Sequence, residues 1–234
     1  MNEINKIPDP IIECDINNVY YPSEDSYLII DYFKKNITST HIDGLEHGKI
    51  KLILDMGTGS GLLAIFFQIL KNIYADFNPK IFASDILREA IENAKINEKT
   101  NKKIYSFRDD IIFLHSNLFD SFPSKLLNSF DIIVFNPPYL PSIKEKKRNI
   151  FNKKIDHSWD GGKNGLRIIE EFLTKAKIYI KREKKNSCIY LTTSSLANLD
   201  NLETTIEENN YEFSILDKVH YFFEDILLFR LHLQ

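Results

Sequence analysis

Apolar positions along this chain follow two spacings, one typical of short buried strands and one typical of helices. The apolar runs of strand length cover 49–56, 81–85, 111–114, 130–135 and 187–193. The segments with apolar residues at helical spacing cover 23–35, 62–70, 87–95, 166–182 and 196–210. The chain ends in two further strand-like runs, at 211–220 and 224–233, separated by a short turn.

This alternation predicts an α/β fold with a mostly parallel sheet and an antiparallel hairpin at its C-terminal end. We expect a single domain over 1–234, with an N-terminal arm and helix at 1–40 and a catalytic core at 49–234. Ser23 is the expected cap of the first helix. The polar stretches 36–48 and 97–108 are expected to be connecting loops.

The ends of the strands hold the most informative residues, because ligands of open parallel sheets bind beyond the carboxyl ends of the strands. One apolar run stops abruptly at Asn136-Pro137-Pro138-Tyr139. Neither proline donates a backbone hydrogen bond, and each favours an extended residue before it. Asn136 and the carbonyls near it therefore suit a substrate that presents an amide or amine NH₂ group. By itself, a match of four residues fits equally well a loop that merely ends a strand.

A glycine-rich segment, 55–61 (DMGTGSG), follows the first expected strand. It is not a dinucleotide-binding fingerprint, because Leu62 stands where the third glycine belongs, and it lacks the lysine of a P-loop. Asp55 can accept from an ammonium group, and Asp85, after the next strand, from two ribose hydroxyls. These features fit S-adenosylmethionine, which has an amino acid end and a ribose but no phosphate. The alternative is a turn that serves only helix–sheet packing.

Composition and charge exclude other classes of function. The chain has 234 residues, 43% hydrophobic and 27% charged, with a net charge of −3, which argues against a dedicated nucleic-acid binder. Cys14, Cys188 and the six histidines show no metal-ligand spacing, so no metal site is expected. No apolar run approaches a membrane span of about 18 residues, and no signal peptide is evident. We expect no membrane association and a cytoplasmic location, with the nucleus as a second compartment.

Taken in order, 55–61, Asp85 and 136–139 resemble a class I methyltransferase of the NPPY type. Segments 19–28 (VYYPSEDSYL) and 159–167 (WDGGKNGLR) are similar to two motifs of the HemK-like release-factor glutamine methyltransferases of eukaryotes and archaea. The second motif departs from the family's in one inserted residue before the arginine. The resemblance implies a Rossmann-like, seven-stranded methyltransferase sheet and S-adenosylmethionine as cofactor. The basic stretch 144–154 is unlike the family, and its role stays open.

The resemblance also implies roles for individual residues. The family has Asp where this chain has Asn117, a departure that affects cofactor affinity, since an amide both accepts from and donates to an adenine edge. The cofactor-binding residues that it implies are Ser26, Asp55, Gly57, Gly59, Asp85, Asn117, Leu118 and Asn136. The catalytic residues that it implies are Asn136, Pro137 and Tyr139.

The motif suggests how an amide, a poor nucleophile, is made to react. Asn136 Oδ1 and the Pro137 carbonyl would accept the two amide hydrogens and fix the nitrogen in line with the methyl group, while Tyr139 packs on the amide plane. The leading hypothesis is N5-methylation of the glutamine in the Gly-Gly-Gln loop of a class 1 translation termination factor. The alternative is a nucleic-acid N6-adenine methyltransferase, since the same geometry positions an exocyclic amine. A non-catalytic scaffold is a third hypothesis.

Members of the resembled family form heterodimers with a small zinc-binding activator protein, which is therefore the expected partner. In the usual strand order of this fold, the run 111–114 would be an edge strand. A long apolar edge favours association unless something covers it. We expect the partner to add a strand there, the alternative being cover by the protein's own helices.

Overall fold

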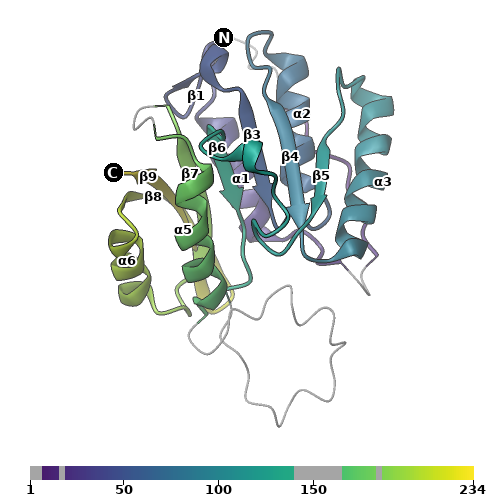
Figure 1. The fold of residues 1–234 in the computed structure, drawn as a ribbon. Helices are drawn as coiled ribbons and strands as arrows, with labels where there is room; N and C mark the ends of the chain where they lie inside the picture. The colour runs from purple at the N-terminus through teal and green to yellow at the C-terminus, as the bar shows by residue number, and fades with distance from the viewer. Residues whose placement is uncertain (1–6, 16–18, 140–164, 183–185) are drawn as a thin grey trace, which may run out of the picture.

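The computed structural model describes residues 7–15, 19–139, 165–182 and 186–234. The basic stretch 144–154 and the turn at 159–164 lie outside the described residues. Figure 1 shows a central sheet with helices on both of its faces. The helices of the layers are α1 (Glu24–Lys35), α2 (Leu62–Ile73), α3 (Arg88–Tyr105), α5 (Arg167–Tyr179) and α6 (Leu199–Glu208).

The sheet contains seven strands, as the hydrophobic pattern predicts. They are β3 (Leu52–Met56), β4 (Lys80–Asp85), β5 (Ile112–His115), β6 (Ile132–Phe135), β7 (Cys188–Ser194), β8 (Tyr211–Tyr221) and β9 (Glu224–Leu233). Their order across the sheet is β5-β4-β3-β6-β7-β9-β8. Strands β3 to β7 are parallel, whereas β9 runs antiparallel to both β7 and β8. The predicted α/β fold with an antiparallel terminal hairpin is confirmed.

The strand order places a switch point beside β3. The chain moves outward from β3 to β4 and β5, then returns to β6 on the other side of β3. The carboxyl ends of β3 and β6 therefore open a crevice in which ligands of such sheets bind. Two apolar clusters hold the layers together: α1 and α2 pack on one face of the sheet, and α5 and α6 on the other. Helix α2 is buried over its first ten residues, which explains its almost wholly apolar sequence.

Helix α3 is the main departure from the pattern. It continues to Tyr105, through the stretch 97–108 that was expected to be a loop. Asn97 and Asn101, which are poor helix formers, are buried, and their side-chain amides bond to the backbone of Glu13 and Ile11 in the N-terminal arm. Tertiary hydrogen bonds thus stabilise a helix that local propensity would end.

Two smaller expectations also need correction. The stretch 36–48 contains a short hairpin, β1 (His41–Ile42) and β2 (Leu45–Glu46), and then the 3₁₀ turn η1 (His47–Lys49). Ser23 does precede α1, but its hydroxyl donates to the Glu24 carboxylate and makes no capping bond. No helix in the described part of the chain is long and apolar enough to cross a membrane.

Candidate functional site

A cavity of about 370 Å³ opens at the carboxyl edge of the sheet. Its walls come from the loops after β3, β4, β5 and β6, from the first turns of α5, and from the segment before α1. All eight predicted cofactor residues line the cavity. These residues are Ser26, Asp55, Gly57, Gly59, Asp85, Asn117, Leu118 and Asn136. Of the predicted catalytic residues, Pro137 and Tyr139 are buried behind this wall instead.

The glycine-rich loop needs its glycines for conformation and for space. Gly57 and Gly59 have positive φ values of 64° and 54°, which side chains adopt only with strain. A Cβ on Gly57 would also lie 3.2 Å from the Phe135 ring. The loop therefore brings bare backbone to the cavity wall, where a ligand can approach it closely.

Asp55 lies at the base of this loop and is almost fully buried. Its Oδ2 accepts from the Thr58 hydroxyl at 2.6 Å and from the Ala64 backbone N–H at 3.1 Å. Burial raises the pKa of Asp55 to about 7, with a smaller contribution from the negative charge of Asp85. A cationic ligand group at the cavity wall would favour the ionised carboxylate.

Asp85 ends β4 and faces the same cavity. Its Oδ2 accepts from the Gly59 N–H at 2.9 Å, and its Oδ1 accepts from the Leu87 N–H at 2.8 Å. Burial raises the pKa of Asp85 above its ordinary value, although these backbone bonds oppose the shift. Each oxygen keeps one further lone pair, which fits recognition of two adjacent hydroxyls.

Asn136 occupies the tip of β6, as predicted, and is held by two hydroxyls. Its Nδ2 donates to Ser26 Oγ at 3.0 Å, and its Oδ1 accepts from the Thr192 hydroxyl. Ser26 in turn donates to Asp25 Oδ1 at 3.2 Å. One lone pair of Oδ1 and one N–H of the amide remain for a ligand.

Tyr139 closes this hydrogen-bonded chain from the other side. Its hydroxyl donates to Asp25 Oδ2 at 3.1 Å, so the motif at 136–139 is tied to the N-terminal segment at both of its ends. Burial, together with the nearby charge of Asp25, raises the pKa of Tyr139. Gly165 packs against the same residue: with φ at +74°, a Cβ there would lie 2.3 Å from the Tyr139 carbonyl oxygen. The backbone at 139 therefore leaves no room for a side chain at 165.

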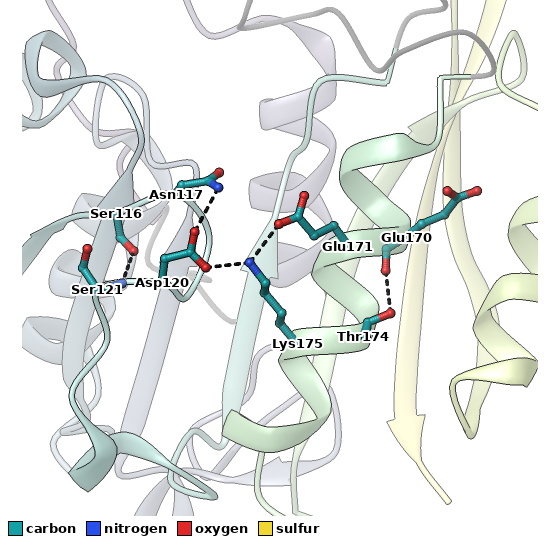
Figure 2. A network of polar contacts seen from close by, with 8 residues as sticks. All are labelled: Ser116, Asn117, Asp120, Ser121, Glu170, Glu171, Thr174 and Lys175. Carbon is teal, nitrogen blue, oxygen red and sulfur yellow. Dashed lines mark hydrogen bonds and ion pairs between the residues drawn. The ribbon is translucent and has the colours of Figure 1, made fainter.

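Two lining residues of the cavity, Asn117 and Glu171, belong to a network of charged and amide groups (Figure 2). Asn117 Nδ2 donates to Asp120 Oδ2 at 3.1 Å. Asp120 pairs with Lys175 of α5 at 2.6 Å, and Lys175 also pairs with Glu171 at 2.8 Å. The ion pair with Lys175 holds the pKa of Asp120 below its ordinary value. Two residues of the cavity wall, Asn117 and Glu171, are thereby linked across the gap between β5 and α5.

Several residues of the site do not follow from the sequence pattern. Thr192 orients Asn136 from a strand 56 positions away, and Glu171 reaches the cavity from a helix. Asp25 belongs to the motif at 19–28, and the acidic pair in that motif is the sequence feature that could have indicated its role. Among the described residues, no cluster of three or more His, Cys, Asp or Glu side chains could hold a metal ion. The groups present, two carboxylates and a glycine-rich loop that lacks the lysine of a P-loop, fit S-adenosylmethionine.

Comparison with known proteins finds methyltransferases. A family model for the methyltransferase small domain matches residues 36–164. A putative protein N5-glutamine methyltransferase of Methanocaldococcus jannaschii is 29% identical over 210 residues, which are 90% of this chain and 89% of the relative. The eRF1 methyltransferase catalytic subunit mtq2 of Schizosaccharomyces pombe is 29% identical over 175 residues, 72% of this chain and 71% of the relative.

Solved structures show the same architecture. A chain of the E. cuniculi Mtq2–Trm112 complex, which is responsible for methylation of the eRF1 translation termination factor, superposes with a TM-score of 0.61. The two chains are 21% identical, and the match covers 92% of this chain and 99% of the other. At that identity the superposition establishes the fold.

Proposed function

The chain belongs to the methyltransferase small domain family, and on that premise we propose that it N5-methylates a glutamine of a translation termination factor. The target is the glutamine of the Gly-Gly-Gln loop of a class 1 factor. S-adenosylmethionine is the cofactor and supplies an electrophilic methyl group. We also propose that residues 1–234 act as one catalytic unit.

The observation that carries this proposal is the oriented amide of Asn136 in the cavity lining. Hydrogen bonds to Ser26 and Thr192 fix which of its atoms face a ligand. The similarity to a protein N5-glutamine methyltransferase over nine-tenths of the chain supports glutamine as the target. The similarity to an eRF1 methyltransferase subunit supports a termination factor as the substrate protein.

The chain's own residues then perform three tasks. Asn136 Oδ1 accepts one hydrogen of the substrate amide, which raises electron density on the nitrogen and fixes its direction. The resemblance implies the Pro137 carbonyl as acceptor of the other hydrogen, although Pro137 is buried and does not line the cavity in the free protein. Tyr139, buried and bonded to Asp25, keeps the loop rigid and excludes water. No strong base is needed, because the nitrogen loses its proton after methylation. Positioning and fixed dipoles account for the rate.

Two aspartates, Asp55 and Asp85, would hold the cofactor that carries the methyl group. The ammonium of its amino acid end suits the Asp55 carboxylate, while the ribose hydroxyls suit Asp85. Gly57 and Gly59 permit close approach of the backbone. Asn117 and Leu118 would frame the adenine.

Transfer of labelled methyl groups tests the proposal. The substrates are a termination factor with an intact Gly-Gly-Gln loop, the same factor with Gln→Ala in that loop, and duplex and single-stranded DNA. Label on the intact factor alone, lost with Asn136→Ala in the enzyme, is the expected result. Label on DNA alone would overturn the proposal in favour of an adenine methyltransferase.

We propose in addition that the chain works as a heterodimer with a small zinc-binding activator, as the resemblance implies. Strand β5 supports this, because it forms one edge of the sheet and its Ile112 is 39% exposed. The partner would add a strand along β5. Co-expression should yield a one-to-one complex in which amide exchange of 112–115 is slowed. A soluble, active monomer with this edge exposed would contradict the heterodimer.

A further inference from the structure

The side chain of Asn117 can present two opposite chemical groups to a ligand. Its Oδ1 accepts hydrogen bonds and its Nδ2 donates them, so the orientation of the amide decides what the cavity recognises at this point. The related family has a carboxylate at this position. Both of its oxygens accept hydrogen bonds, so either orientation of the group presents an acceptor. Asn117 therefore requires a neighbour that selects one of two orientations.

Asp120 is that neighbour. The two residues lie at the ends of a tight turn, in which the Asp120 N–H donates to the Asn117 carbonyl at 3.0 Å and Leu118 has a φ of 45°. This turn places both side chains on the same side. Asp120 is held as an anion by Lys175, and a carboxylate only accepts hydrogen bonds. Only the Nδ2 group of Asn117 can satisfy it.

The consequence is a directed amide. Figure 2 shows Nδ2 turned toward Asp120 and Oδ1 directed away from it. Within the described part of the chain, Oδ1 accepts no hydrogen bond. Asn117 lines the cavity together with Ile86 and Leu118, whose apolar side chains suit contact with a planar base. Of the two polar atoms of the amide, Oδ1 is therefore the one with no bond to the described residues, while Nδ2 has one of its two N–H groups held by Asp120.

We propose that Asp120, anchored by Lys175, is a positioning residue that turns Asn117 Oδ1 toward the cavity and thereby selects a 6-amino purine. This rests on the proposed use of S-adenosylmethionine. An exocyclic 6-amino group donates to Oδ1, whereas a 6-oxo group would meet it acceptor to acceptor. Glu171 sets the position of Lys175 from one helical turn away.

The test measures dissociation constants of S-adenosylhomocysteine and S-inosylhomocysteine by titration calorimetry. The wild-type protein should prefer the adenosyl compound. Asp120→Ala frees the amide, so it should weaken adenosyl binding about fivefold and leave inosyl binding equal or tighter, which corresponds to one hydrogen bond. The variant Asn117→Asp in the Asp120→Ala background should restore the adenosyl preference, because a carboxylate presents an acceptor in either orientation.

Asp110→Ala is the matched control, since Asp110 is an exposed aspartate paired with Lys102 and does not line the cavity. It should change neither constant. Equal weakening of both ligands by Asp120→Ala, or failure of the double variant to restore preference, would overturn the positioning role. Binding of neither ligand by the wild-type protein would overturn the cofactor assignment and this role together. Normal ligand selection without methyl transfer to glutamine would overturn only the proposed substrate.

Discussion

The two asparagines that we propose to orient ligands in this cavity are held in contrasting ways. At the transfer end, defined by Asn136 with Ser26 and Thr192, the partners are neutral hydroxyls that are 8% and 0% exposed. At the base end, defined by Asn117 with Asp120 and Lys175, the partners are an ion pair with side chains 51% and 30% exposed. Buried neutral bonds are not screened by salt, whereas exposed ion pairs are.

The difference matches what each end has to do. Methyl transfer depends on in-line geometry, and a small displacement there costs much of the rate. A rigid, dry network secures that geometry. Selection of a base needs only the correct hydrogen-bonding group, so a solvent-exposed arrangement suffices. The transfer end should therefore give large mutational effects, and the base end small ones that depend on salt.

The largest effect is expected for Asn136→Ala. The variant loses the acceptor for the substrate amide, and kcat should fall by roughly 10² to 10³, the cost of one preorganised catalytic hydrogen-bonding group. Binding of S-adenosylhomocysteine should change less than about threefold. The control is Asn201→Ala, at an exposed position of α6. If cofactor affinity and kcat fell by equal factors, Asn136 would act in cofactor binding as much as in methyl transfer.

Gly165→Ala should give the next largest effect, on stability as well as on rate. The added Cβ meets the Tyr139 carbonyl at 2.3 Å, at a positive φ, so we expect roughly 2–3 kcal/mol of lost unfolding free energy from strain. Denaturant unfolding measures this. Gly48→Ala is matched to it, because nothing lies within 4 Å of a Cβ there. Comparable losses in both variants would contradict the tight approach at 139.

Protonation of Asp55 should make cofactor binding depend on pH. In the free protein the pKa of Asp55 is about 7. The cationic ammonium group of the cofactor favours the ionised form of this carboxyl. Affinity for S-adenosylhomocysteine should therefore rise roughly fivefold from pH 6 to pH 7.5. Because the folded pKa lies above the unfolded one, the unfolded state binds fewer protons, and Asp55 lowers stability as pH rises through this range. Asp55→Asn should flatten the binding profile, and an unchanged profile would exclude Asp55 as its origin.

The sequence predicts the residues at strand ends better than the residues that hold them in place, for a physical reason. Asp55, Asp85 and Asn136 follow apolar runs whose period reveals strand ends, and the topology then brings strand ends together. Thr192 acts through a contact with a residue 56 positions away, and Asp120 through a turn contact that also involves the distant Lys175. No local period marks either residue. The length of α3 was missed for the same reason, since Asn97 and Asn101 stabilise it through bonds to the distant arm.

The smallest effect is expected for Lys175→Ala, and the variant Lys181→Ala serves as its comparison. Lys175 pairs with an exposed carboxylate, so its loss should leave the unfolding free energy unchanged. The affinity for S-adenosylhomocysteine should fall about twofold, and by less at high salt.

Lys181 pairs at 2.5 Å with Asp131, which is 2% exposed and also accepts from the Lys51 and Leu52 N–H groups. Lys181→Ala should cost roughly 2 kcal/mol, because a buried carboxylate loses a charged partner, and should leave cofactor affinity unchanged. Thermal unfolding and calorimetry on the two variants separate these outcomes, and an equal loss of stability would mean that exposure does not set the strength of these pairs.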